Sequence, residues 1–174
     1  APAMYLHPVK EVVYANDDVR KELRLSSGDF VMVMKYAPGV TLSQWRKQFS
    51  NGQVPVDKAI EICKQVASAL DYAHSEKIIH RDIKPSNIMW HKRQVYKLID
   101  FNISTTTDDH SFGGTLPYMA PDLVVSGNKI DWDCSADTFA FGVTLYQLLT
   151  HAYPWPGSQL RPNIHMEPTP IQQY

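Results

Sequence analysis

The longest regular pattern of apolar residues begins near Asp57. Apolar side chains recur there at steps of three and four, at Ala59, Ile60, Cys63, Val66, Ala67, Leu70 and Ala73. This spacing predicts an amphipathic helix from residue 57 to about residue 76, with one buried stripe. A shorter pattern of the same kind covers residues 42–49 and is broken at Asn51-Gly52.

A second helix is predicted from about Asp137 to Thr150, and its pattern differs. Its apolar residues surround the helix axis: Phe139, Ala140, Phe141, Val143, Leu145, Leu148 and Leu149. A helix that is apolar all round belongs in the centre of a core. The proline-rich residues 154–174 predict an extended connection rather than a packed element, so we expect a partner chain or further segments to cover this helix.

Two other apolar regions predict strands. Residues 30–36 form an apolar run that ends at Pro38-Gly39, which is typical of a buried strand. Residues 88–90 and 95–99 predict a hairpin.

Composition and charge narrow the class of protein. The chain has 174 residues, 44% of them hydrophobic, and a formal net charge of -1. These values predict a globular, soluble and cytoplasmic protein, because no apolar run approaches the roughly 20 residues that cross a bilayer. Without a basic stripe we expect no binding to nucleic acid or an anionic membrane. Cys63 and Cys134 show no disulfide or zinc spacing, so free thiols are predicted.

Candidate chemistry lies between the two long helices, in His80-Arg81-Asp82-Ile83-Lys84-Pro85-Ser86-Asn87 and Leu98-Ile99-Asp100-Phe101-Asn102. These segments resemble the catalytic loop H-R-D-x-K-x-x-N and the metal motif D-F-G of the protein kinase family. Residues 114–122 resemble that family's G-T-x-x-Y-x-A-P-E, and residues 137–143 resemble its D-x-W-S-x-G-V helix. The four motifs occur in the family's order.

The resemblance implies a protein-kinase-like α+β fold. Residues 1–36 would be a remnant of the β-rich small lobe with the hinge. Residues 37–174 would be a mostly helical large lobe lacking the last helices.

Phosphoryl transfer needs a carboxylate at the acceptor hydroxyl, cations on the migrating phosphate and oxygen ligands for Mg²⁺. By resemblance, Asp82 accepts or orients the hydroxyl proton and Lys84 neutralises charge on the γ-phosphoryl group. Asn87 and Asp100 hold Mg²⁺ in the same comparison. Lys84 and Thr115 match the serine/threonine-specific pattern, which adds Thr115 to the catalytic set.

The nucleotide site is also implied by resemblance. Met34 falls beside the adenine, the backbones of Lys35 and Ala37 fall where the hinge binds its edge, and Met89 falls beneath it. For both methionines, packing in the core is the simpler interpretation.

The N-terminal region admits two registers, and no G-x-G-x-x-G loop occurs in the sequence. In the first, residues 9–14 form the strand after the regulatory helix, and no ATP-anchoring lysine is present. In the second, Lys10 is that lysine and Glu22 is its helix partner. A solvated surface lysine is the third interpretation of Lys10.

The function implied is that of an ATP- and Mg²⁺-dependent serine/threonine protein kinase acting on protein substrates. The alternative is a pseudokinase or kinase fragment that acts as a protein-interaction module. His80 is expected to be a packed structural residue together with Phe101. The remaining histidines are expected on the surface or in loops: His7, His74, His91, His110, His151 and His165.

Overall fold

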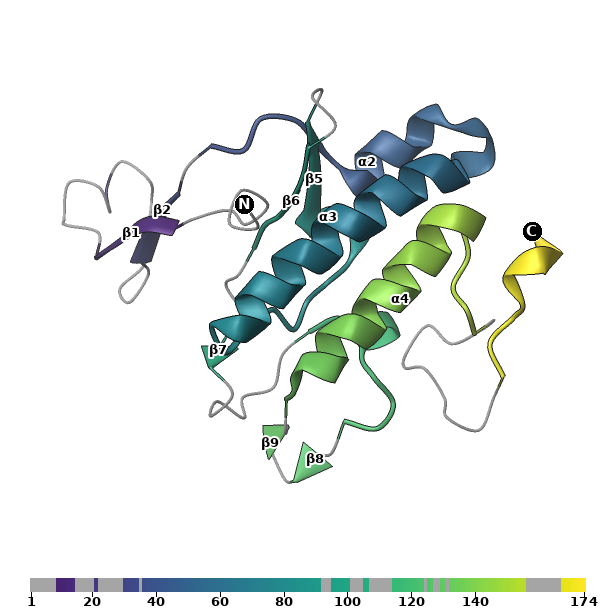
Figure 1. Cartoon of the computed structure of the whole chain (residues 1–174). Helices are drawn as coiled ribbons and strands as arrows, with labels where there is room; N and C mark the ends of the chain where they lie inside the picture. The colour runs from purple at the N-terminus through teal and green to yellow at the C-terminus, as the bar shows by residue number, and fades with distance from the viewer. Residues whose placement is uncertain are drawn as a thin grey trace. The chain divides into compact units, whose positions relative to one another are not determined.

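The structure is a computed structural model, and its chain divides into two compact units, one within residues 7–38 and one from Gly39 onward. Figure 1 shows the elements of each unit. The interpretation of the first part as a small-lobe remnant with the hinge stays a prediction. The structure describes residues 9–14, 21, 30–34, 36–91, 95–100, 105–106, 114–123, 125–126, 129–130, 132–155 and 167–174.

The smaller unit contains one antiparallel pair, β1 (Val9–Tyr14) and β2 (Phe30–Met34). The strand predicted from residue 30 is thereby confirmed over Phe30–Met34. The bounds of β1 are those that the first N-terminal register assigns to a strand. The pairing is irregular between Val9 and Glu11, and Lys10 lies at this irregularity.

The larger unit is built on two long helices, α3 (Val56–Ser75) and α4 (Cys134–Thr150), which lie side by side (Figure 1). The predicted position of α3 is confirmed to within one residue at each end. Its buried stripe differs from the predicted one, because Ile62 is fully buried whereas Ile60 is 49% exposed. Ile60 lies outside the face of α3 that packs on the core. The buried residues of α3 are Ala59, Ile62, Val66, Ala69, Leu70 and Ala73.

Helix α4 begins three residues earlier than predicted, because Asp133 caps it. The Asp133 carboxylate accepts hydrogen bonds from the backbone N–H groups of Ser135 (2.8 Å) and Ala136 (3.3 Å). Such a cap satisfies donors that have no partner within the helix. The predicted central position is confirmed, since α4 contributes Ala140, Phe141, Val143 and Leu148 to the main core.

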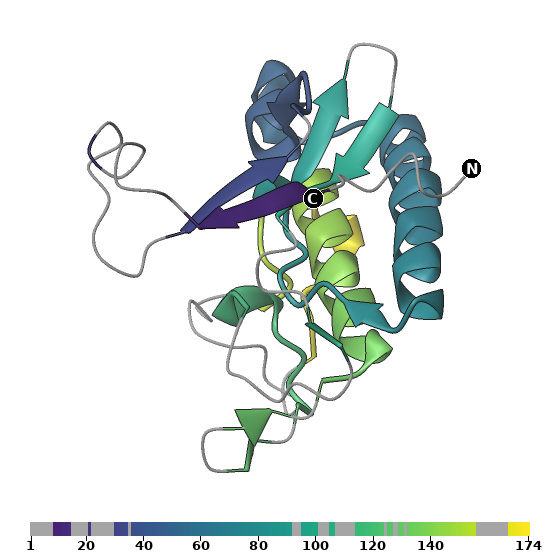
Figure 2. The ribbon, with the colours of Figure 1, turned by 90° about the vertical axis from the view of Figure 1, so that its left-hand side faces the viewer.

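The predicted hairpin is confirmed as β5 (Ile88–His91) and β6 (Val95–Leu98), with β3 (Val40–Thr41) on the other side of β5. Strand β6 packs against α3, and Figure 2 shows the hairpin beside that helix. Helix α2 (Leu42–Trp45) follows β3 and begins with a capping box formed by Thr41 and Gln44. The predicted break after it is confirmed, since Asn51 has a positive φ of 54°.

The remaining elements are short. Strand β4 (Ile78–Ile79) pairs with β7 (Thr105–Thr106), and β8 (Val125–Ser126) pairs with β9 (Lys129–Ile130). Single 3₁₀ turns cover Arg46–Gln48 (η2), Ser50–Gly52 (η3), Pro85–Asn87 (η4), Leu116–Tyr118 (η6) and Ile171–Gln173 (η7).

The prediction that the proline-rich tail is an extended connection rather than a packed element holds for most of residues 167–174, which are exposed, but a few described tail residues do contact α4. The Trp155 ring stacks on Phe139 with 5.9 Å between centroids. Tyr146 donates a hydrogen bond to the Thr169 carbonyl at 2.8 Å, and its ring meets Tyr174 edge-on. Aromatic rings supply enough apolar area to hold an extended segment on a helix despite its prolines.

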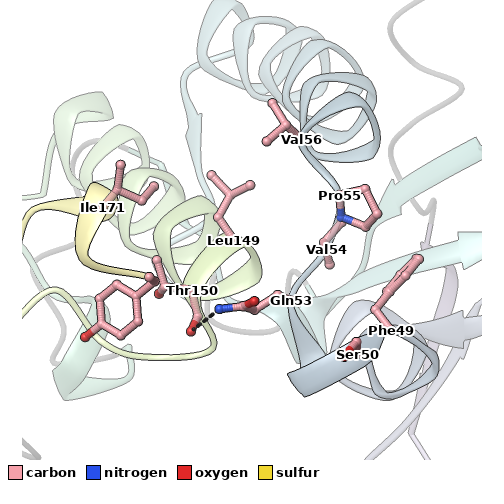
Figure 3. Close-up of a pocket in the computed structure, with 10 residues that line it drawn as sticks. Phe49, Ser50, Gln53, Val54, Pro55, Val56, Leu149, Thr150 and Ile171 are labelled. Carbon is pink, nitrogen blue, oxygen red and sulfur yellow. Dashed lines mark hydrogen bonds between the residues drawn. The ribbon is translucent and has the colours of Figure 1, made fainter.

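The main core and the tail together cover most of the large apolar side chains of α4. Phe141 and Leu148 are buried, while Phe139, Leu145 and Leu149 are half-buried. Whether a partner chain adds further cover stays a prediction. A mostly apolar cavity of about 520 Å³ lies between the start of α3, the end of α4 and η7 (Figure 3). Leu149, Val56 and Ile171 line it, and it contains no residue of the catalytic loop.

Both cysteines are free and half-buried, as predicted. Among the helices that the structure describes, none has the length and apolarity that crossing a bilayer requires.

Candidate active site

One buried carboxylate of α4 holds the backbone of the segment 80–87, the catalytic loop of the sequence comparison, by hydrogen bonds. Asp137 has no exposed surface, and its oxygens accept hydrogen bonds from the backbone N–H groups of His80 and Arg81, both at 2.8 Å. The Nε2 atom of His74 lies 2.9 Å from Asp137 Oδ2. The expectation of a surface or loop His74 is wrong, because this residue lies in the last turn of α3 and links it to α4.

Arg81 adopts a left-handed backbone conformation, with φ at 67°. This conformation costs a residue with a Cβ atom about 1 kcal/mol. The hydrogen bond from its N–H group to Asp137 offsets that cost. The Arg81 guanidinium lies over the Trp132 ring, 5.4 Å from its centroid.

His80 is fully buried and tied at both ring nitrogens, which confirms the predicted structural role. Its Nε2–H donates to the Ile99 carbonyl at 2.9 Å, and its Nδ1 accepts from the Asp82 N–H at 3.3 Å. This pair of bonds needs the neutral imidazole. Burial lowers the pKa of His80, and the nearby carboxylates, chiefly that of Asp137, oppose this effect. Its expected companion Phe101 lies outside the described residues.

Asp82 is the centre of the candidate site. Its Oδ1 accepts a 2.5 Å hydrogen bond from the Thr115 hydroxyl. Its Oδ2 accepts a bond from Asn87 Nδ2 at 2.9 Å and pairs with Lys84 Nζ at 2.7 Å. Lys84 Nζ also donates to the Thr115 hydroxyl at 2.8 Å. The structure thus brings four of the predicted catalytic and metal residues into direct contact.

The amide of Asn87 is oriented by Asp82. Its Nδ2 donates to the Asp82 carbonyl at 2.8 Å as well as to the Asp82 carboxylate, which uses both amide hydrogens. The Asn87 amide oxygen therefore remains as a ligand atom. A bond from the Ile99 N–H to the Asn87 carbonyl (3.0 Å) ties the residue before Asp100 to this turn.

An amide oxygen and a carboxylate are hard oxygen ligands, which fit Mg²⁺. The described residues contain no group of three or more histidines, cysteines and acidic residues that could hold a metal ion. Mg²⁺ needs fewer protein ligands than such a group supplies, because it commonly keeps water and substrate phosphates beside one or two of them.

Gly114 allows the segment before Thr115 to approach the catalytic loop. Its φ is 91°, and a Cβ atom there would lie 2.8 Å from the Arg81 carbonyl oxygen. Any other residue would clash with the backbone, so glycine at this position lets Thr115 reach Asp82.

The predicted nucleotide contacts are not brought together in this way. Met89 is half-buried on β5, where it pairs with Lys97. Met34, Ala37 and Lys10 belong to the smaller unit, and Lys35 lies outside the described residues. Their contacts with a nucleotide stay predictions.

Sequence reasoning noted Asp137 only as part of a motif and assigned it no task. A usable signal was present, because Asp137 is the only charged residue in the 17 residues of α4. A lone carboxylate in an apolar helix must find hydrogen-bond donors when it is buried.

Comparison with known proteins identifies a family and relatives of the chain. A family model described as "Protein kinase domain" matches residues 10–173. The chain is 36% identical over 130 residues to a probable serine/threonine-protein kinase of Clostridium acetobutylicum, covering 71% of this chain and 19% of that protein. It is 31% identical over 179 residues to the serine/threonine-protein kinase PknB of Mycobacterium leprae, covering 96% and 27%.

The chain belongs to the protein kinase family, and its fold is protein-kinase-like α+β. A third relative is the serine/threonine-protein kinase PrkC of Bacillus subtilis, 33% identical over 134 residues, which cover 74% of this chain and 20% of that protein. The chain thus spans about a fifth to a quarter of the length of these curated relatives.

Proposed function

We propose that this chain carries the catalytic residues of a serine/threonine protein kinase, which transfers the γ-phosphoryl group of ATP to hydroxyl groups of proteins. The observation that carries the proposal is the cluster of Asp82, Lys84, Asn87 and Thr115, joined by bonds of 2.5–2.9 Å. The serine/threonine kinases among the relatives support the acceptor class.

Asp82 would receive or orient the proton of the acceptor hydroxyl. A carboxylate has about four lone-pair positions. Oδ2 is occupied by Asn87 and Lys84, whereas Oδ1 accepts only from Thr115 among the bonds of the described residues. One position on Oδ1 is therefore available for a substrate hydroxyl, in a geometry that needs little rearrangement.

Lys84 would neutralise charge that develops on the migrating phosphoryl group. Its ammonium lies within hydrogen-bond distance of both Asp82 and Thr115, so the charge is already placed beside the acceptor position. The side chain is 24% exposed, which leaves it accessible to a phosphate.

Asn87 and Asp100 would hold Mg²⁺. When bound, this ion neutralises phosphate charge and helps to align the transferred group. The protein's own contribution is the orientation of the Asn87 amide by Asp82.

The test is phosphate transfer from radiolabelled ATP by the whole protein. Asp82→Asn and Asp100→Ala should each lower the rate at least a hundredfold, because each removes a group that stabilises the transition state. Asp71→Asn, an exposed carboxylate on α3, is the matched control and should retain the wild-type rate.

A wild-type protein without phosphoryl transfer and without Mg·ATP binding would contradict the proposal. That result would favour the protein-interaction module instead.

A further inference from the structure

A second cavity lies where α2, α3 and the β5–β6 hairpin meet (Figure 1), and its walls are mostly aromatic. Its volume is about 350 Å³. The side chains that line it are those of Trp45, Gln48, Phe49, Lys58, Trp90 and Tyr96. None of these residues belongs to the catalytic cluster, so this cavity is separate from the candidate active site.

The aromatic rings of the wall form one connected group around Trp45. Trp45 stacks on Trp90, with 5.5 Å between the ring centroids. It meets Phe49 edge-on at 4.8 Å and Tyr96 edge-on at 6.1 Å. Trp90 and Phe49 are only half-buried, so part of each ring remains available to a further aromatic ring.

The Tyr96 hydroxyl is the one polar group of the buried part of this wall. Tyr96 is fully buried, and its hydroxyl has no hydrogen-bond partner among the residues that the structure describes. A buried hydroxyl without a partner is costly and uncommon in folded proteins. The Tyr96 backbone is fixed, because its N–H donates to Gln65 Oε1 at 3.0 Å. An acceptor atom that entered the cavity would remove this cost.

The charges near the hydroxyl define which acceptor fits. Burial, followed by the carboxylates of Glu61 and Asp57, raises the pKa of Tyr96 to about 12. The phenol therefore keeps its proton at neutral pH and can donate it. Lys58 Nζ lies 3.3 Å from a carboxylate oxygen of Glu61, which compensates that charge. The charge of Asp57 remains, so the surroundings disfavour an anionic ligand.

We infer that this cavity is a binding site for a small, neutral, planar aromatic molecule that carries a carbonyl group. Its ring would stack on Trp90 and Phe49, and its carbonyl oxygen would accept the hydrogen bond of the Tyr96 hydroxyl. Because that hydroxyl is not exposed, the wall must open slightly, and the exposed Gln48 side chain can turn aside. Small-molecule sites of this size typically combine apolar walls with a few placed polar groups. The inference does not depend on the proposed function.

The first experiment is an NMR titration of the isotope-labelled whole protein with 2-acetonaphthone, a neutral bicyclic aromatic ketone. The indole N–H signals of Trp45 and Trp90 should shift as the ketone is added. Those of Trp132 and Trp155, which do not line the cavity, should stay in place.

Two related probes test the chemical class. Cyclohexyl methyl ketone keeps the carbonyl group but cannot stack, and 2-naphthoate keeps the rings but carries a negative charge. Each should bind at least about fivefold more weakly than 2-acetonaphthone.

The matched variants test the role of the hydroxyl. Tyr96→Phe keeps the ring and should weaken the binding of 2-acetonaphthone about tenfold, because the hydrogen bond to the ligand is lost. The melting temperature of the ligand-free variant should equal or exceed that of the wild type, since an unpaired buried hydroxyl has been removed. Tyr72→Phe changes an exposed tyrosine of α3 and should leave the affinity unchanged.

Several results would overturn the inference. Unmoved Trp45 and Trp90 signals would show that the cavity does not bind the ketone, and shifts of all four indole signals would mean non-specific binding. Equal affinity of Tyr96→Phe and wild type would exclude the hydroxyl as the donor. Tighter binding of 2-naphthoate than of the ketone would contradict the choice of a neutral ligand.

Discussion

The catalytic loop and the C-terminal tail both pack on α4, but by different forces. The loop is bound to Asp137 through two backbone hydrogen bonds of 2.8 Å. The described residues of the tail are held mainly by aromatic rings, such as Trp155 stacked on Phe139, and by a hydrogen bond from Tyr146 to Thr169.

The two kinds of contact do different things: hydrogen bonds fix the position of the loop, whereas ring contacts only shield α4 from solvent. Hydrogen bonds to a buried carboxylate are directional, and a small displacement leaves buried polar groups unpaired. Ring contacts lose little energy when a segment slides, since burial is non-directional. The chain uses directional bonds where Asp82 must be placed, and apolar contact where α4 only needs covering.

The largest expected effect is loss of the Asp137 carboxylate. Asp137→Ala should lower the free energy of unfolding by about 3–5 kcal/mol, because it leaves the N–H groups of His80 and Arg81 buried without an acceptor. Asp137→Asn keeps one acceptor oxygen and should lose less. Urea denaturation of the whole protein measures both. If Asp137→Ala and wild type were equally stable, the hydrogen bonds to Asp137 would not be what holds the loop on α4, and the contrast with the tail would be wrong.

A substitution in the tail should lower the free energy of unfolding less than the loss of Asp137 does, and it should leave the catalytic rate unchanged. Trp155→Ala removes a half-buried ring and should cost about 2 kcal/mol of unfolding free energy. The rate of phosphoryl transfer per folded molecule should stay at the wild-type value. Tyr174→Ala is the control for an exposed ring, 54% accessible, and should cost under about 0.5 kcal/mol. A large fall in kcat for Trp155→Ala would show that the tail positions the site.

The smallest expected effect is a pH dependence of the protein's stability, which arises from the buried His80 of the catalytic loop. Burial lowers the pKa of His80 below its ordinary value of 6.5, although the carboxylates of Asp137, Asp82 and Asp100 act in the opposite direction. Below about pH 6.5 the unfolded chain binds a proton that the folded His80 does not. The unfolded state is then favoured, and stability should fall by up to about 1.4 kcal/mol per pH unit.

Thermal melts of wild type and His80→Gln between pH 7.5 and 5.5 check this, because glutamine cannot take up the proton. The melting temperature of the wild type should fall more steeply with decreasing pH. Parallel curves would mean that His80 does not contribute to the pH dependence.

The sequence alone predicted the elements whose signals are local. The 3.6-residue period of α3, the apolar run of α4 and the β5–β6 hairpin were recognised from neighbouring residues. The residues of the catalytic cluster were found because Asp82, Lys84 and Asn87 lie within one short motif. Their mutual distances were not predicted, and the two N-terminal registers could not be separated.

Only the tertiary structure decided the links between distant segments. Asp137 meets residues 56 and 57 positions away, and Gln147 meets Tyr118 from 29 positions away. The packing of the tail on α4 and the contact of His74 with Asp137 are of the same kind. Periodicity reports which face of an element is buried, whereas the partner of a buried polar group depends on how the whole chain packs.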